Sequence, residues 1–337
     1  MASISKPAAV LTFSSLAFFA FQYIVGHAQK SGLFAALESQ CSASSPFTQA
    51  YSGVPVLDRT LCILVSVFHE TFKTANGIEF LTYFIASATP LVAHVYFEAG
   101  RRNSPFPLSL PLLFVQGFQV ATFGATFAVY WLLFILTGAA EFQPAGRKTL
   151  VTMGHVLNIL FGLAIGLGYL TYAMIERKDP YTTALWQVFP LIVSGASYLP
   201  VLVLPSHNVG RRESGFNVLR AFYGLAAIGL AYMHVTLLRT KTTEELKALF
   251  VPSLSVLSSS TPTELQALDL FQWDMIFGLG SSLLGTVWFA RDVTEAIGLL
   301  IFNAVATLVV GPGAAFAAVA LWREGRLHSD IRSGNPE

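Results

Sequence analysis

Apolar residues gather in long runs along this chain, and short segments between the runs carry most of its charges. Each run is close to the length of about 20 residues that an α-helix needs to cross the hydrocarbon core of a bilayer. The pattern predicts an all-α fold, a polytopic transmembrane bundle of about nine helices: Ala8–Gly26, Val54–Phe72, Gly77–Phe97, Leu112–Leu136, Leu150–Ile175, Ala184–Leu204, Phe216–Leu237, Phe271–Arg291 and Ala296–Leu321. Eight helices are the alternative, if the more polar second one lies in the membrane interface.

The segments between these runs complete a single transmembrane domain over residues 1–337. We expect polar loops at 28–53 and 238–270, with a short surface helix at Lys241–Phe250, and a loose tail at 322–337. Pro190 and Pro200 predict a kink in the sixth helix. The distribution of Lys and Arg between the loops favours a cytosolic carboxyl terminus. We find no internal repeat, which weighs against transporter folds built from duplicated halves.

The composition agrees with a membrane protein. The chain is 54% hydrophobic and only 12% charged, about half the charge of a soluble domain. Its net charge is +1 and no basic face interleaves with aromatic residues, so we expect no nucleic-acid partner. The expected surroundings are a lipid bilayer, namely the endoplasmic reticulum membrane, and the oligomeric state stays open. Cys41 and Cys62 form neither a disulfide framework nor a metal-binding pattern.

One carboxylate lies inside an apolar run. Asp274 comes near the start of the span Phe271–Arg291, directly after Gln272 and Trp273. An ionisable side chain within a membrane span is costly and marks a functional site by default. Small residues follow it at Gly278, Ser281, Ser282 and Gly285, and such residues let neighbouring helices approach closely. We therefore expect Asp274 to face the inside of the bundle.

A buried carboxyl group suits acid catalysis. In an apolar cavity it stays protonated at neutral pH and can donate its proton to an epoxide or an alkene. Asp274 and Glu70 are the main candidates, with Glu98 and His69 as further catalytic candidates; His94 or His155 would be alternatives for taking a proton back. Trp273 and Phe68 are placed to stabilise a carbocation through their rings. Gln272, together with His155 and Asn158 on one helix face, completes the predicted substrate-binding set.

Several other chemistries lack their signatures. The chain has no paired Asp-rich motifs for a magnesium-bound diphosphate, no histidine boxes for a di-iron site, no HExxH and no Gly-x-Ser-x-Gly elbow. We expect no metal site and no cofactor. Metal-free acid catalysis is the chemistry that fits the remaining residues.

Three segments together resemble a known family: LDRTLCILVSVFHETF (57–72), YFEAGRRNS (96–104) and FQWDMIFGLGSSLLGTVW (271–288). They are similar to fungal integral membrane proteins of polyketide and meroterpenoid pathways, which include terpene cyclases of the ascochlorin, ascofuranone and macrophorin type. The resemblance implies a metal-free cyclase that acts on a prenylated aromatic compound carrying an epoxide or alkene. It adds Arg102 and Asn103 to the candidate substrate-binding residues, because they match the second segment.

Three functions remain open. The first is a cyclase in which the apolar substrate enters from the bilayer and Asp274 donates a proton. The second is a proton-coupled transporter of a hydrophobic metabolite, with Asp274 as the coupling site. The third is a non-catalytic scaffold for pathway enzymes. The sequence leaves open which ring is formed and which carboxylate is the acid.

Overall fold

The chain folds almost entirely into helices. The computed structural model describes residues 6–42, 44–101, 104–140, 151–203 and 213–333. Within these ranges the only β-type pairing is one isolated bridge between Thr152 and Ser214. The predicted all-α class is therefore confirmed for the described residues.

Four helices are long and apolar enough to cross a membrane. They coincide with the first, third, fifth and seventh predicted spans. Two of them are continuous through a π-helical turn (η1, Gln22–Gly26; η3, Ala164–Tyr169). The four are Lys6–Lys30 (α1, Lys6–Phe21, to α2, His27–Lys30), α5 (Ala75–Ala99), Met153–Arg177 (α8, Met153–Leu163, to α9, Leu170–Arg177) and α14 (Phe216–Thr240).

Three other predicted spans are broken into shorter helices. The predicted helix 112–136 is α6 (Pro111–Val120) and α7 (Phe123–Leu136), separated at Thr122, whose φ is 145°. The predicted helix 296–321 is α17 (Val293–Val309) and α18 (Pro312–Ser333), separated at Gly311 with φ 90°. Both predictions of one unbroken helix were wrong, because a backbone with positive φ ends a right-handed helix.

The proline-containing span bends more sharply than predicted. It consists of α10 (Pro180–Gln187), α11 (Phe189–Ala196) and α12 (Leu199–Val203). Pro190 and Pro200 each stand at the second position of a new short helix, where proline is tolerated. The expected kink is thus confirmed as a full interruption.

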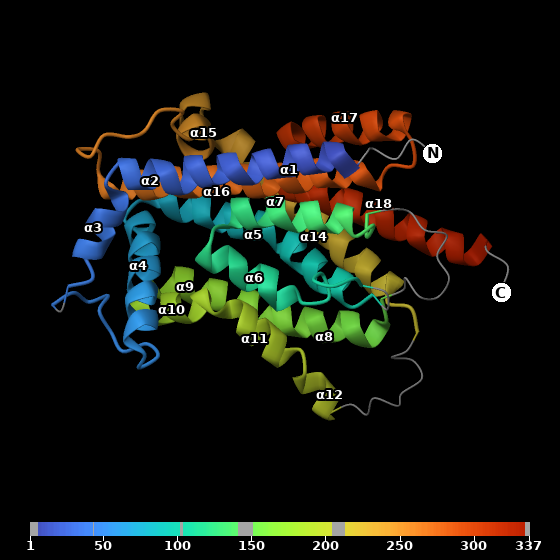
Figure 1. The fold of residues 1–337 in the computed structure, drawn as a ribbon, viewed down its shortest axis with the longest axis horizontal. Coiled ribbons are helices and arrows are strands. Elements are labelled where there is room, and N and C mark those ends of the chain that lie inside the picture. Colours follow the sequence, from blue (N-terminus) through green and yellow to red (C-terminus); the bar gives the residue numbers. More distant parts are fainter. Residues whose placement is uncertain (1–5, 43, 102–103, 141–150, 204–212, 334–337) are drawn as a thin grey trace.

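Helix α4 (Pro55–Phe72) has a different direction from its neighbours. Figure 1 shows it running across the end of the bundle, whereas α1, α7 and α16 run along the bundle's length. This direction is closer to the eight-helix alternative than to nine parallel crossings.

Helix α16 (Thr263–Gly285) is the central element, and η4 (Thr286–Phe289) continues it. It contacts α1, α4, α5, α7 and α18. A Cβ atom at Gly278 would lie 1.9 Å from the Phe123 ring, and one at Gly285 would lie 2.3 Å from the Trp131 ring. The prediction that small residues on this helix admit close neighbours is therefore confirmed.

The polar segments are more ordered than expected. The first loop contains α3 (Leu33–Ser39), and the second contains α15 (Thr243–Phe250). Helix α15 begins with a capping box, in which Thr242 and Glu245 satisfy each other's backbone N–H groups. The short surface helix is thus confirmed, with its start two residues later than predicted.

The carboxyl-terminal tail 322–337 was predicted to be loose, and over 322–333 this was wrong, whereas 334–337 lie outside the described residues. Helix α18 continues to Ser333, and Arg323 and Glu324 are both 7% exposed. Glu98 of α5 and Arg101, which follows α5, are the ionic partners that account for the burial of these charges.

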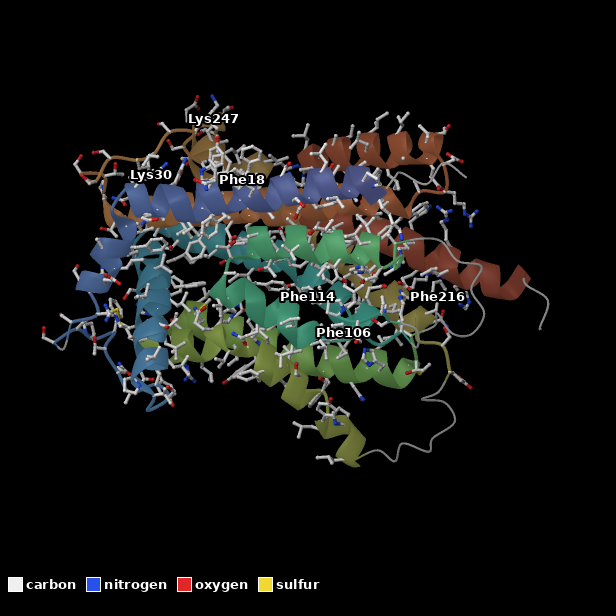
Figure 2. The ribbon with its side chains drawn as sticks, in the orientation of Figure 1. Phe18, Lys30, Phe106, Phe114, Phe216 and Lys247 are labelled. Carbon is white, nitrogen blue, oxygen red and sulfur yellow. A yellow bond between two sulfur atoms is a disulfide. The ribbon has the colours of Figure 1, made fainter. Side chains whose placement is uncertain are left out.

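The two cysteines form a disulfide bond, contrary to our reading of their spacing. Cys41 follows α3, Cys62 lies on α4, and their sulfur atoms are 2.05 Å apart. Sulfur is drawn in yellow beside α4 in Figure 2. The chain after α3 folds back along α4, a proximity that the spacing of two cysteines does not reveal.

Candidate functional site

An apolar cavity of about 440 Å³ lies beside the middle of α16. Residues of α1, α3, α4, α5, α10 and α16 line it, together with the segment 118–125 that joins α6 to α7. Phe21 and Val120 also line it and are 53% and 73% exposed, so one part of the wall reaches the outer surface. Asp274 is the only charged residue among the described lining residues.

Asp274 is held by the first backbone amides of α7. Its Oδ1 atom accepts a hydrogen bond from the Gly124 N–H at 2.7 Å, and Oδ2 accepts a longer one from the Phe123 N–H at 3.3 Å. The side chain is 7% exposed. The positive end of the α7 dipole therefore faces the carboxyl group, an arrangement that stabilises negative charge there.

The break between α6 and α7 creates this arrangement. Thr122 caps α7 by accepting from the Ala125 N–H, and its φ of 145° is strained for a β-branched residue. Gly124 lies so close to α16 that an added Cβ would be 2.7 Å from Phe277 Cβ. A broken helix in an apolar bundle is tolerated where it lines a cavity, because its free amides find partners there.

Aromatic rings form two groups in the wall of the cavity. The Phe68 ring lies between Phe271 and Trp186, with centroid distances of 4.9 and 5.1 Å. Phe84 and Phe123 meet edge to face at 5.3 Å. Phe271 precedes Asp274 by three residues and therefore shares its helix face. The structure thus brings Phe68 and Asp274 of the predicted site to one cavity.

The two predicted neighbours of Asp274 point elsewhere. Gln272 donates to the backbone carbonyls of Ala248 and Leu249 at 2.8 Å and so attaches α15 to α16. Trp273 packs on Tyr23 at 4.5 Å and donates to the Ser253 carbonyl at 3.1 Å. Consecutive helix residues face different directions, and neither side chain is among those that line the cavity in the described structure.

Glu98 belongs to a buried ionic cluster that ties α5 to α18. Arg323 Nη1 donates to Glu98 Oε1 at 2.7 Å, and Arg101 donates to the same oxygen at 2.7 Å and also pairs with Glu324. All four side chains are at most 10% exposed. The cluster lies beyond Val92, the last residue of α5 in the cavity wall. The structure therefore supports a structural role for Glu98.

Glu70 and His69 lie on α4 but outside the cavity wall. Glu70 is 1% exposed, accepts from Lys73 Nζ at 2.6 and 2.7 Å, and accepts from Gln40 Nε2 at 2.7 Å. His69 packs on Phe47 at 5.0 Å, with its Nε2 atom 3.3 Å from the Thr183 hydroxyl. Neither residue is among the described residues that line the cavity with Asp274.

The remaining candidates lie at the opposite end of the bundle or outside the described residues. His155 Nε2 is 3.0 Å from the Tyr96 carbonyl oxygen, a contact that joins α8 to α5. Asn158 is partly buried one turn later on α8, and neither lines the cavity among described residues. Arg102 and Asn103 lie outside the described residues.

Sequence reasoning missed the polar lining residue Gln187. It ends α10, is 2% exposed and lines the cavity beside Trp186. Neither atom of its side-chain amide has a hydrogen-bond partner among the described residues. Gln187 was visible in the sequence as an amide within a predicted apolar span. Pro190, three residues later, was the signal of the break at which Gln187 lines the cavity.

The fold and the cavity define a class: an all-α protein with helices able to cross a membrane and an apolar cavity whose described lining includes one carboxyl group. The chain belongs to the CtvD domain family, a family of secondary-metabolite pathway proteins, and residues 8–327 match it. This agrees with the pathway type that the three sequence segments implied, while the cyclase type stays a prediction.

One curated relative is similar over most of this chain. It is the FAD-dependent monooxygenase verC1 of Penicillium polonicum, which is 22% identical over 343 aligned residues. The alignment covers 93% of this chain and 42% of the relative, so the chain spans about two fifths of that protein's length. No solved structure matches the chain.

Proposed function

We propose that the protein is a membrane-embedded terpene cyclase that converts a prenylated aromatic compound to a cyclic isomer by general acid catalysis. The observation that carries the proposal is the placement of Asp274 in the wall of a largely apolar, aromatic-lined cavity. Membership of a secondary-metabolite family supports it. The site of action under this proposal is the endoplasmic reticulum membrane.

The cavity fits a neutral hydrocarbon ligand. Its volume of about 440 Å³ is within the range of pockets that bury small molecules. The described lining residues include no Lys, Arg or His, and a diphosphate requires such cations or a metal ion. Exposed apolar residues at its rim, Phe21 and Val120, offer a lateral entrance from the hydrocarbon phase.

The proposed reaction begins with proton transfer from Asp274. Oδ1 is engaged by the shorter hydrogen bond from Gly124, so Oδ2 is the oxygen that carries the proton. The proton passes to the epoxide oxygen of the substrate and the adjacent C–O bond breaks. The electron pair of a neighbouring alkene forms the new C–C bond and leaves a cation further along the chain.

The series of reaction steps ends without any net consumption of protons. The final cation loses a proton or is captured by a hydroxyl group of the same molecule, which then loses its proton. Returning one proton to the Asp274 carboxylate restores the acid. Substrate and product therefore have the same mass.

Two features of the site favour this chemistry. The apolar surroundings favour the neutral acid before reaction, whereas the α7 amides stabilise the carboxylate that remains after proton transfer. The aromatic wall of Phe68, Phe271 and Trp186 presents ring faces and edges near the cavity, and ring faces stabilise positive charge.

The relative suggests how the substrate arises. Its printed name describes an FAD-dependent monooxygenase, and the matched part is only 42% of its length. A monooxygenase can insert oxygen into an alkene to give an epoxide. Under our proposal, such a reaction precedes the step that this chain carries out.

Assay of the purified protein tests the proposal. The protein in lipid nanodiscs receives a farnesylated phenol with a terminal epoxide, and chromatography with mass spectrometry follows the products. We expect a cyclic isomer of unchanged mass, absent from protein-free nanodiscs. In proteoliposomes, movement of the unaltered compound coupled to protons would instead indicate the transporter, and neither conversion nor movement would indicate the scaffold.

A further inference from the structure

The cavity contains a second polar group that the proposed acid chemistry does not use. Gln187 is 2% exposed, and both its Oε1 and its Nε2 lack a partner among the described residues. Buried amides in folded proteins are nearly always hydrogen-bonded, because leaving one unpaired destabilises the fold. Gln187 lines the cavity, and its two amide atoms lie covered in the wall, so a rotation of this side chain would bring an unpaired amide to a ligand there.

The backbone around Gln187 holds this side chain in place. The residue ends α10, immediately before the short helix α11, and its own carbonyl oxygen accepts from Gln116 Nε2 at 3.5 Å. Its neighbour Trp186 is fixed by a hydrogen bond from its indole N–H to the Thr171 hydroxyl at 2.9 Å. The break between the helices thus places Gln187 in the wall of the chamber at a defined position.

Gln187 and Asp274 occupy different parts of the cavity wall. Trp186 contacts Phe68, and Phe68 contacts Phe271, which stands one helical turn before Asp274. The three rings therefore form a row in the cavity wall. Trp186, at one end, adjoins Gln187, and Phe271, at the other end, stands one turn before Asp274. A ligand that reaches both groups needs a polar end, a hydrocarbon middle and a second reactive end.

We infer that Gln187 is the anchor for the polar head of the substrate and selects a neutral head that both donates and accepts a hydrogen bond. A side-chain amide has both a donor group and an acceptor oxygen and carries no charge, so it matches a phenol or a hydroxyl beside a carbonyl. The inference rests on the proposed function for the reacting end, since it places the hydrocarbon chain along the aromatic row toward Asp274.

Equilibrium binding tests the anchor without requiring turnover. The protein in nanodiscs receives a farnesylated phenol and, separately, farnesylbenzene, which lacks the hydroxyl group. We expect the wild type to bind the phenol about tenfold more tightly, because one hydrogen bond to an otherwise unpaired amide is worth about 1.4 kcal/mol. Gln187→Leu should bind both compounds equally, with unchanged affinity for farnesylbenzene.

Stability provides a second readout. Leucine removes the unpaired amide, so the ligand-free Gln187→Leu protein should melt at the same temperature as the wild type or higher. Gln119→Leu is the matched control, because Gln119 lines the same cavity but is partly exposed. It should retain the preference for the phenol.

The outcomes separate this inference from the proposed function. A phenol preference that persists in Gln187→Leu, or a marked loss of melting temperature in that variant, overturns the anchor. Absence of cyclisation with the preference intact overturns the cyclase and leaves the anchor standing. If the wild type cyclises the epoxide but binds the phenol and farnesylbenzene equally, the anchor is overturned and the cyclase stands.

Discussion

Among single residues, the buried carboxyl groups differ most in the partners that hold them. Asp274 lines the cavity, accepts from the backbone N–H groups of Phe123 and Gly124, and has no adjoining base in its apolar run. Glu70 pairs with Lys73, three residues away, a spacing that was visible in the sequence. Glu98 pairs with Arg323, and a separation of 225 residues hides such a partner from any local pattern.

Replacing Glu98 tests its structural role. In Glu98→Gln the buried Arg101 and Arg323 lose the carboxylate that both contact, which typically costs about 3–5 kcal/mol. We expect a large fall in the midpoint of thermal unfolding in detergent. The reason is an uncompensated charge in the protein interior and not the loss of a proton donor.

A more exposed pair provides the comparison. Glu79 contacts Lys241 at 2.8 Å with 32% and 24% of the side chains exposed, so Glu79→Gln should cost about 1 kcal/mol or less. If Glu98→Gln instead melts like the wild type and fails only in turnover, Glu98 returns to the catalytic candidates.

At the scale of elements, the interruption between α6 and α7 decides the site. The run 112–136 is apolar throughout, so hydrophobic pattern alone predicts one helix. Thr122 and Gly124 are the local signals of a break, since threonine caps helices and glycine permits close approach. What fixes the break is Asp274, some 150 residues later, because its carboxyl group receives the amides that the break frees.

The packing of α7 against α16 can be tested with two glycines of one helix. At Gly278 an added Cβ would lie 1.9 Å from the Phe123 ring, whereas at Gly280 nothing lies within 4 Å. Gly278→Ala must displace Phe123, whose backbone N–H reaches Asp274. We expect this variant to lose about 1–3 kcal/mol of stability and much of its cyclisation rate.

Gly280→Ala is the control. Alanine is the better helix former by about 1 kcal/mol, so this variant should be as stable as the wild type or more stable, with unchanged turnover. Equal behaviour of the two variants in melting and in product formation would show that the close contact of α7 with α16 does not position the acid.

For the molecule as a whole, helix content and the four longest spans were predictable from hydrophobic length. The direction of α4 and the pairing of Cys41 with Cys62 were not, because both depend on how distant segments pack. The same holds for α18, whose charged half is helical because Glu98 of α5 compensates Arg323 and Arg101, just after α5, compensates Glu324.

The disulfide predicts how the protein lies in the membrane. Figure 1 shows the start of α1 and the end of α18 at one end of the molecule, opposite α3 and α4. The disulfide lies at the α3 and α4 end, because Cys41 follows α3 and Cys62 is on α4. Disulfides persist on the oxidising side of a membrane. We therefore expect α3 and α4 at the lumenal side and both ends of the described chain at the cytosolic side.

Thiol labelling in sealed microsomes measures this orientation, because Cys41 and Cys62 are the only cysteines. A membrane-impermeant reductant followed by a bulky maleimide should add no mass to the protein in intact vesicles and two labels after detergent is added. Labels acquired in intact vesicles would place the disulfide end in the cytosol. Labels acquired without reductant would show that the bond does not form.

The central claim is that Asp274 gives its proton to a substrate inside the cavity, and turnover by Asp274→Asn tests it most directly. Asparagine can still accept from the Gly124 N–H but has no acidic proton. Asp269→Asn is the control, since Asp269 is a second buried carboxylate of α16 that accepts from the Ser253 N–H at 2.6 Å and lies outside the cavity lining. We expect Asp274→Asn to remain folded and to bind the farnesylated phenol, while its rate of cyclisation falls about a hundred- to ten-thousand-fold and that of Asp269→Asn does not. A folded Asp274→Asn protein that cyclises the epoxide at the wild-type rate would contradict the account.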